Sequence, residues 1–307
     1  MRRCAFMGLG ICLLAVLPTY GQKKSVAEML GHPADAKLLM IHADDLGLGH
    51  GVDEASFAAL ENRAVTTGSI MVPCPWFTEV AAYARAHPDA DLGLHLTLTS
   101  EWKSYRWGPL ASRRDVVGLL DPSGFFWPDT TPVAKSAKPE EVESEIRAQI
   151  ETALKAGIHP THIDSHMGTL FTPAFFPVYV KVAREYGLPF FALPIVTGAP
   201  AMASQIKESD AFPDALAMAS SSVKPDQWLE YYIGIVRSLK PGLTEVIVHL
   251  GKDDAELQAI TEGHPAFGSA WRRRDFDVLT SPEFRKALQD NHVVLVGWKE
   301  IKALQKH

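Results

Sequence analysis

Short apolar runs typical of buried strands alternate with longer amphipathic runs along most of this chain, and this alternation limits the fold more than any other feature. Strands that alternate with helices form a parallel sheet with the helices outside, either as a barrel or as an open sheet. No repeat or low-complexity segment interrupts the pattern, so we expect one α/β domain. The expected strands are 38–41, 65–72, 92–98, 161–166, 189–193, 244–250 and 292–296. The expected helices are 52–63, 77–86, 140–156, 173–186, 226–239, 281–289 and 298–305.

The composition limits the classes of partner. The chain has 307 residues, of which 47% are hydrophobic and 21% charged, values that are ordinary for a soluble globular protein. Its net charge of -6 argues against a nucleic-acid-binding surface, which would need a basic stripe. A small neutral or cationic substrate remains open.

The first 22 residues have the three parts of a secretory signal peptide: a basic start, an apolar run and a small residue, Gly21, for cleavage. We therefore expect a mature domain over 23–307, located in the periplasm or outside the cell, with no stable membrane insertion after cleavage. An uncleaved N-terminal anchor is the alternative. After cleavage only Cys74 would remain, so the mature chain could form no internal disulfide.

The stretch 38–51 joins an apolar run to polar residues and glycines. Asp44 and Asp45 follow the run directly, which is where α/β proteins place reactive groups, at the carboxyl edge of a sheet. Neighbouring residues of an extended strand point to opposite sides, so the two carboxylates should sit in different environments unless the strand has ended. One could then hold a metal while the other transfers protons. Alternatively, either aspartate simply caps the following helix.

Other expected strands also carry polar groups at their centres or ends. His162, Asp164 and His166 alternate on one strand face, where burial is costly unless a metal or hydrogen bonds satisfy them. His95 and His249 lie on two further strands, and each taken alone is more commonly a core histidine than a ligand. Together with the aspartate pair, these histidines favour a mononuclear Asp-His-His site.

Two segments lack readable structure. Residues 99–139 are rich in Trp, Pro and Gly, and such a long irregular segment is typically functional, so we interpret it as a substrate loop. Residues 197–224 are interpreted as an excursion or lid. Trp102, Trp107 and Trp271 could stack on sugar faces, or could belong to the core. Arg273 lies in a charge run that could be a solvated face, or could supply an arginine that orients Asp44.

In combination, five segments resemble the YdjC-like (ChbG/HpnK) carbohydrate deacetylases, relatives of the NodB-type polysaccharide deacetylases, over about residues 38–305. The resemblance implies a distorted (β/α) barrel of about seven parallel strands and removal of acetyl from N-acetylated sugars. It also implies Asp44 as general base, Asp45, His95 and His166 as metal ligands, and His249 as general acid. The segments are HADDLGLGHGVDEA, VTTGSIMV, LGLHLTLT, PTHIDSHMG and VIVHLG.

The chain departs from the family pattern at two places. Met167-Gly-Thr follows the second histidine of the THIDSH segment, where the family often has further histidines. His249 is followed by Leu-Gly, where the family often has Pro-Gly. Both departures are expected at the pocket wall, so they affect the choice of substrate more than the reaction.

The predicted activity is therefore metal-dependent hydrolysis of an N-acetylated carbohydrate with one divalent ion, Zn or Mg, with Mn, Co or Ni as alternatives. The ion would activate water and polarise the acetamide, Asp44 would take the water proton, and His249 would protonate the leaving amine. The rivals are another metal-dependent amidohydrolase or phosphodiesterase, and a catalytically inactive secreted sugar-binding protein. A homodimer is left open. Candidate substrate contacts are His162 (also the alternate metal ligand), Asp164, Trp102, Trp271 and Arg273.

Overall fold

The computed structural model describes residues 25–192, 200–207 and 209–305. The predicted signal peptide, and with it the boundary at residue 23, lies outside the described residues. So do parts of the expected strand 189–193 and of the expected lid 197–224.

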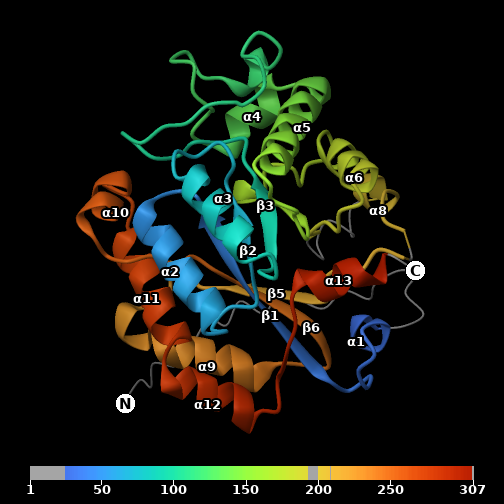
Figure 1. Cartoon of the computed structure of the whole chain (residues 1–307), viewed down its shortest axis with the longest axis vertical. Coiled ribbons are helices and arrows are strands. Elements are labelled where there is room, and N and C mark those ends of the chain that lie inside the picture. The colour runs from blue at the N-terminus through green and yellow to red at the C-terminus, as the bar shows by residue number, and fades with distance from the viewer. Residues whose placement is uncertain (1–24, 193–199, 208, 306–307) are drawn as a thin grey trace, which may run out of the picture.

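The described residues form a single α/β domain built on a parallel sheet, which confirms the predicted fold class (Figure 1). The strand order is β4-β3-β2-β1-β6-β5, with β7 beside the amino-terminal part of β1. The sheet curls into a half-barrel with helices outside it, in keeping with the expected distorted barrel of about seven strands. The strands are β1 (Lys37–Leu46), β2 (Thr67–Ile70), β3 (Leu92–Leu96), β4 (Ile163–Ser165), β5 (Ala215–Met218), β6 (Gly242–Val248) and β7 (Val294–Leu295).

Strand β1 is longer than expected and contains both aspartates. Its pairing with β2 runs from His42 opposite Thr67 to Ala43 opposite Gly68, and then shifts so that Leu46 lies opposite Ile70. One extra residue in β1 makes this a bulge. Asp45 accommodates it with a φ of 71°, in the left-handed region that aspartate enters more readily than most residues.

Most of the expected helices are confirmed within a few residues, and α3 has the predicted bounds. Others were not expected, among them α4, α10 and α11. The helices are α1 (Val26–Met29), α2 (His50–Glu61), α3 (Phe77–Ala86), α4 (Thr130–Ser136), α5 (Pro139–Lys155), α6 (Phe176–Glu185), α8 (Pro200–Ala203), α9 (Trp228–Ser238), α10 (Ala255–Ile260), α11 (Ser269–Leu279), α12 (Pro282–Asp290) and α13 (Trp298–Leu304).

Two strand predictions need correction. The described part of 189–193 is not a strand: Phe190 makes only an isolated parallel bridge to Ile163. The segment 197–224, expected as a lid, instead contributes β5, which pairs with β6 along its whole length. The β5 residues are apolar but include no β-branched or aromatic side chain, so the composition did not indicate a strand.

The core lies between the sheet and the helices packed against it. The larger hydrophobic cluster contains residues of strands β1, β2, β3, β4 and β6 and of helices α2, α3, α5, α6 and α9. A smaller cluster contains Leu38 and Met40 of β1 and residues of α1 and α13. The expected substrate loop is tied to α5: buried Glu145 accepts hydrogen bonds from the backbone N–H groups of Leu110 and Ala111. Among the described helices, none is both long enough and apolar enough to cross a membrane.

Candidate active site at the carboxyl edge of the sheet

Polar side chains from four strands meet at the carboxyl ends of those strands. Asp44 and Asp45 lie near the end of β1, His95 near the end of β3, His166 directly after β4, and His249 directly after β6. Because the strands are parallel, their carboxyl ends share one edge of the sheet, and the fold brings together residues that lie far apart in sequence.

Asp45, His95 and His166 form a compact group of potential metal ligands. Oδ1 of Asp45 lies 3.5 Å from Nε2 of His95 and 3.4 Å from Nδ1 of His166. Asp45 is 2% exposed, and its Oδ1 has no hydrogen-bond partner among the described residues. A buried carboxylate oxygen without a partner, facing two imidazole nitrogens, suits a divalent ion.

A carboxylate orients each of these two histidines through its other ring nitrogen. Nδ1 of His95 lies 2.7 Å from Oδ1 of Asp164, and Nε2 of His166 lies 3.0 Å from Oε2 of Glu101. Such pairs fix the tautomer and ring position of a ligand histidine. Asp164, expected to contact substrate, therefore orients His95 instead. Burial would raise its pKa, but His95 and its neighbours lower the pKa of Asp164 to about 2.

Asp44 faces the same group. Its Oδ2 lies 3.8 Å from Nε2 of His95, and its Oδ1 accepts a 3.1 Å hydrogen bond from the hydroxyl of Ser69. Burial raises the pKa of Asp44 to about 6. Asp44 and Asp45 do not point to opposite sides as the strand alternation predicts, because the left-handed backbone at Asp45 breaks the alternation and both carboxylates face His95. Their environments nevertheless differ: Asp44 accepts from Ser69, whereas Asp45 pairs with Arg272.

The arginine at the site is Arg272 rather than Arg273. Arg272 is 1% exposed and donates from Nη2 to Oδ2 of Asp45 at 2.6 Å. Burial raises the pKa of Asp45, but Arg272 and His166 outweigh it and hold that pKa well below its usual value. Arg273 is exposed and pairs with Asp277 on its own helix, so its predicted contact with Asp44 is wrong.

His249 lies at the edge of the group. Its Nε2 is 4.0 Å from Oδ2 of Asp45, and its ring packs against Phe267 at 4.8 Å between centroids. Its backbone N–H donates to buried Asp275, which also accepts from the Trp228 ring nitrogen. Burial lowers the pKa of His249 to about 3, which favours the neutral ring.

Three side chains predicted to contact substrate belong to the core. Trp102 is 2% exposed and Trp271 is 3% exposed, and the latter packs against Trp228 and Phe267. His162 is fully buried and stacks on Trp298 at 4.9 Å. Trp107 is also buried. Their alternative interpretation as core residues is the one that the structure supports.

Sequence reasoning missed five polar residues around the site. Glu245 could have been found from the sequence, because it is an acidic residue inside a mostly apolar strand, where burial requires a partner. Arg272 and Asp275 lie on a helix that was not expected, and Glu101 lies in irregular chain. The missed residues are His42, Glu101, Glu245, Arg272 and Asp275.

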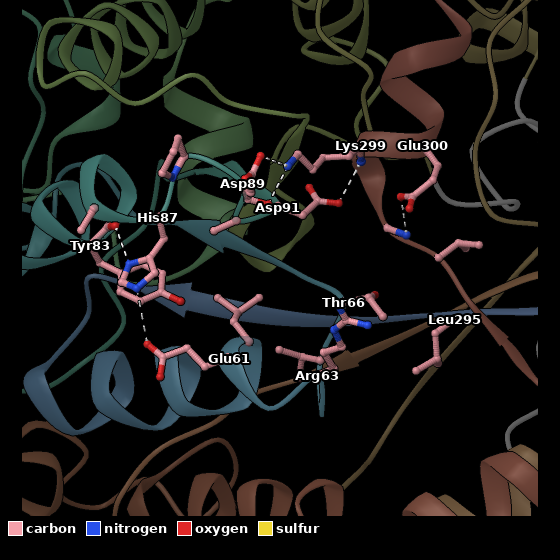
Figure 2. A pocket seen from close by; sticks show the side chains of 17 residues that line it. Glu61, Arg63, Thr66, Tyr83, His87, Asp89, Asp91, Leu295, Lys299 and Glu300 are labelled. Carbon is pink, nitrogen blue, oxygen red and sulfur yellow. Dashed lines mark hydrogen bonds and ion pairs between the residues drawn. The ribbon is translucent and has the colours of Figure 1, made fainter.

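A groove of about 810 Å³ lies elsewhere on the molecule, and the side chains that line it are drawn in Figure 2. It is lined by Val65 and Thr66, which precede β2, by 86–91, which precede β3, and by Lys299 and Glu300 of α13. These positions lie toward the amino ends of β2 and β3, away from the edge that carries the aspartates and histidines. None of the predicted site residues lines this groove.

The fold and the site together define an α/β protein with a buried carboxylate–histidine group at the carboxyl edge of a curled parallel sheet. The profile of the family described as YdjC-like protein matches residues 38–290, and this chain belongs to that family.

Known proteins resemble nearly the whole chain. A carbohydrate deacetylase of Thermus thermophilus is 30% identical over 275 residues, which are 87% of this chain and 94% of that protein. One of Thermoanaerobacter pseudethanolicus is 27% identical over 87% of this chain and all of its own length (100%). The crystal structure of an Enterococcus faecalis protein, provisionally described as a cellobiose-phosphate cleavage protein, has a TM-score of 0.72 at 26% identity, covering 86% of this chain and 98% of its own.

The expected periplasmic or secreted location is wrong on this comparison and is withdrawn. The relatives are named simply as carbohydrate deacetylases, without any reference to export. The segment on which the expectation rested lies outside the described residues.

Proposed function

We propose that this chain is a metal-dependent hydrolase that removes acetyl groups from N-acetylated sugars or oligosaccharides. The carbohydrate deacetylases that it resembles along most of its length support the reaction and the substrate class. The observation that carries the proposal is the convergence of Asp45, His95 and His166 beside Asp44.

The residues present fit one divalent ion. The proposed ligand atoms are Oδ1 of Asp45, Nε2 of His95 and Nδ1 of His166, and the first of these is buried without a hydrogen-bond partner among the described residues. Two imidazoles and a carboxylate suit Zn, Mn, Co or Ni, and Mg remains among the candidates. When bound, such an ion supplies Lewis acidity that polarises an acetamide carbonyl and lowers the pKa of a water.

Asp44 is the proposed general base. Its carboxylate faces His95 without belonging to the proposed ligand set, and Ser69 fixes one oxygen by a 3.1 Å hydrogen bond. A pKa of about 6 leaves Asp44 mostly ionised at neutral pH and still basic enough to accept a proton from water. The attack would yield acetate and a free amine.

His249 is the proposed proton donor to the leaving nitrogen. Its position across Asp45 from the two ligand histidines is compatible with that role. Because burial holds its ring neutral, the ring would have to gain a proton once substrate is bound. Asp275 accepts from the His249 backbone N–H at 3.0 Å and so fixes the position of this residue.

The test is acetate release from N-acetylglucosamine and its oligomers by the chain after chelation, with each divalent metal added back singly. We expect no acetate after chelation and its return with at least one metal. Hydrolysis of a phosphodiester probe supplied in a parallel assay, with no acetate released from the N-acetyl sugars, would favour the phosphodiesterase alternative. Sugar binding without any turnover under all metals would favour the inactive binding protein.

A further inference from the structure

His42, a buried histidine that the proposed reaction does not use, lies beside the carboxylates of Asp44 and Asp164. His42 precedes Asp44 by two residues on β1 and is 1% exposed. Its ring lies among three carboxylates, those of Glu245, Asp44 and Asp164, all of them buried.

One ring nitrogen of His42 is anchored firmly. Nδ1 lies 2.5 Å from Oε1 of Glu245, which is fully buried in β6, opposite β1 in the sheet. The same oxygen accepts a 3.3 Å hydrogen bond from the ring nitrogen of Trp298. Glu245 therefore fixes the orientation of the ring from below, as a carboxylate fixes a ligand histidine in metal sites.

The other ring nitrogen lies between two carboxylates of the site. Nε2 of His42 is 3.3 Å from Oδ1 of Asp44 and 3.3 Å from Oδ2 of Asp164, without hydrogen-bond alignment to either. Each carboxylate has one further hydrogen-bond partner among the described residues, Ser69 for Asp44 and His95 for Asp164. Two buried carboxylates that both lie 3.3 Å from the same ring nitrogen repel each other unless that nitrogen carries a positive charge or donates a hydrogen bond.

We propose that His42 is a positioning residue that holds Asp44 and Asp164 in place at once, with Glu245 as its anchor. Through Asp44 it sets the place of the proposed base, and this part rests on the proposed function. Through Asp164, which bonds Nδ1 of His95, it sets the orientation of a proposed ligand, and this part stands on geometry alone.

Two substitutions separate the ring's two contacts. In His42→Asn the amide nitrogen lies near the former Nδ1, so a donor toward Glu245 remains but the side chain no longer reaches Asp44 and Asp164. In His42→Gln the amide nitrogen lies near the former Nε2, so the donor toward Asp44 and Asp164 remains. His87→Asn is the matched control, since His87 is solvent-exposed and its Nδ1 contacts the backbone oxygen of Tyr83.

The first measurement is acetate release with the added metal. We expect kcat of His42→Asn to fall by about 10–100-fold, the usual effect of removing a partner from the surroundings of a metal site, with KM little changed. His42→Gln should recover a substantial part of that loss, and His87→Asn should match the wild type. Equal losses in the two His42 variants, or no loss in either, would overturn the proposal.

The second measurement does not depend on activity. In the metal-free protein, the imidazole nitrogen signals of His95 in ¹⁵N NMR spectra should change in His42→Asn, change less in His42→Gln, and stay unchanged in His87→Asn. Unchanged His95 signals in both His42 variants would remove the link through Asp164. If the wild type releases no acetate, the proposed function fails, while this measurement still decides the positioning of His95.

Two further observations exclude trivial results. Metal content should be one ion per chain in wild type and in His42→Gln. If wild type binds two ions and one of them is lost when His42 is replaced, His42 is a metal ligand and the proposal is overturned.

If His42→Asn does not fold, Glu245→Gln serves instead, because it keeps the volume and an acceptor but removes the charge that anchors the ring. We expect Glu245→Gln to lower kcat and to alter the His95 signals, and the absence of both effects would contradict our inference.

Discussion

Arg272 donates a 2.6 Å hydrogen bond to Oδ2 of Asp45, while Oδ1 of the same carboxylate faces His95 and His166. One oxygen of this carboxylate thus binds a permanent cation, and the other faces the proposed metal position. The arginine keeps Asp45 ionised when no metal is present, so the group is ready to bind an ion without first losing a proton.

Removing this arginine should destabilise the metal-free protein. Arg272→Met leaves the buried Asp45 charge without its cation, and we expect a loss of about 3–5 kcal/mol in the free energy of unfolding. Arg273→Met is the matched control: its ion pair with Asp277 is exposed, and we expect a change of at most about 1 kcal/mol. Denaturant unfolding of the three proteins measures both. Equal changes in the two variants would show that Arg272 does not carry this charge pair.

Substitution of Asp44 and of Asp45 by asparagine should have different effects on metal binding and turnover. Asp45→Asn is expected to lose metal and activity together. Asp44→Asn should keep the metal but lose about 10²–10⁴-fold in turnover, because no group then accepts the water proton. Metal content and acetate release of both variants check this. Loss of metal in Asp44→Asn, with retention in Asp45→Asn, would reverse the two roles.

Buried Glu145, which accepts hydrogen bonds from the backbone of Leu110 and Ala111, predicts a pH dependence of stability. Burial raises the pKa of Glu145 from 4.5 to about 7, so between these values the folded chain binds more protons than the unfolded chain. The free energy of unfolding should then fall as pH rises through this window, by up to about 3 kcal/mol from this group. Glu145→Gln should flatten that slope relative to wild type in urea unfolding at pH 5 and pH 7.5. A slope that is the same in both proteins would assign the effect to other groups.

The ring of His162 leaves no room for a methyl group at Gly93. A Cβ at Gly93 would fall against the ring of His162, which is fully buried and stacked on Trp298, so the ring cannot move aside. We expect Gly93→Ala to lose about 1–3 kcal/mol. Gly234→Ala, in α9 with nothing within 4 Å of the added atom, should instead gain about 0.5–1 kcal/mol. Thermal unfolding of both variants tests the contrast, and a neutral Gly93→Ala would show that the ring can move.

The sequence predicted the sheet and the convergence of the site because both depend on strand ends, and parallel strands bring their carboxyl ends together wherever the intervening chain goes. It did not predict which arginine serves the site. Arg272 and Asp275 are three positions apart and share the inward face of α11 with apolar Trp271, Val278 and Leu279. That face therefore mixes polar and apolar side chains, and the hydrophobic periodicity that reveals a helix is interrupted.

The aspartate pair shows a second limit. Alternation along a strand is a sound rule only while the backbone stays extended, and no feature of the sequence announces a left-handed residue inside an apolar strand. The bulge that turns Asp45 toward His95 is a property of the pairing between β1 and β2, which the sequence of β1 alone does not contain.

That backbone geometry affects how position 45 can be studied by mutagenesis. With a φ of 71°, the position suits aspartate, asparagine and glycine, while most other side chains are strained there by roughly 1–2 kcal/mol. Alanine scanning would therefore combine two losses at Asp45, that of the carboxylate and that of an unstrained backbone. Asparagine keeps the shape and the backbone preference and removes only the charge. A saturation library at this position, selected for folding alone, should enrich aspartate, asparagine and glycine over other residues, and it would map the bulge without any substrate or metal.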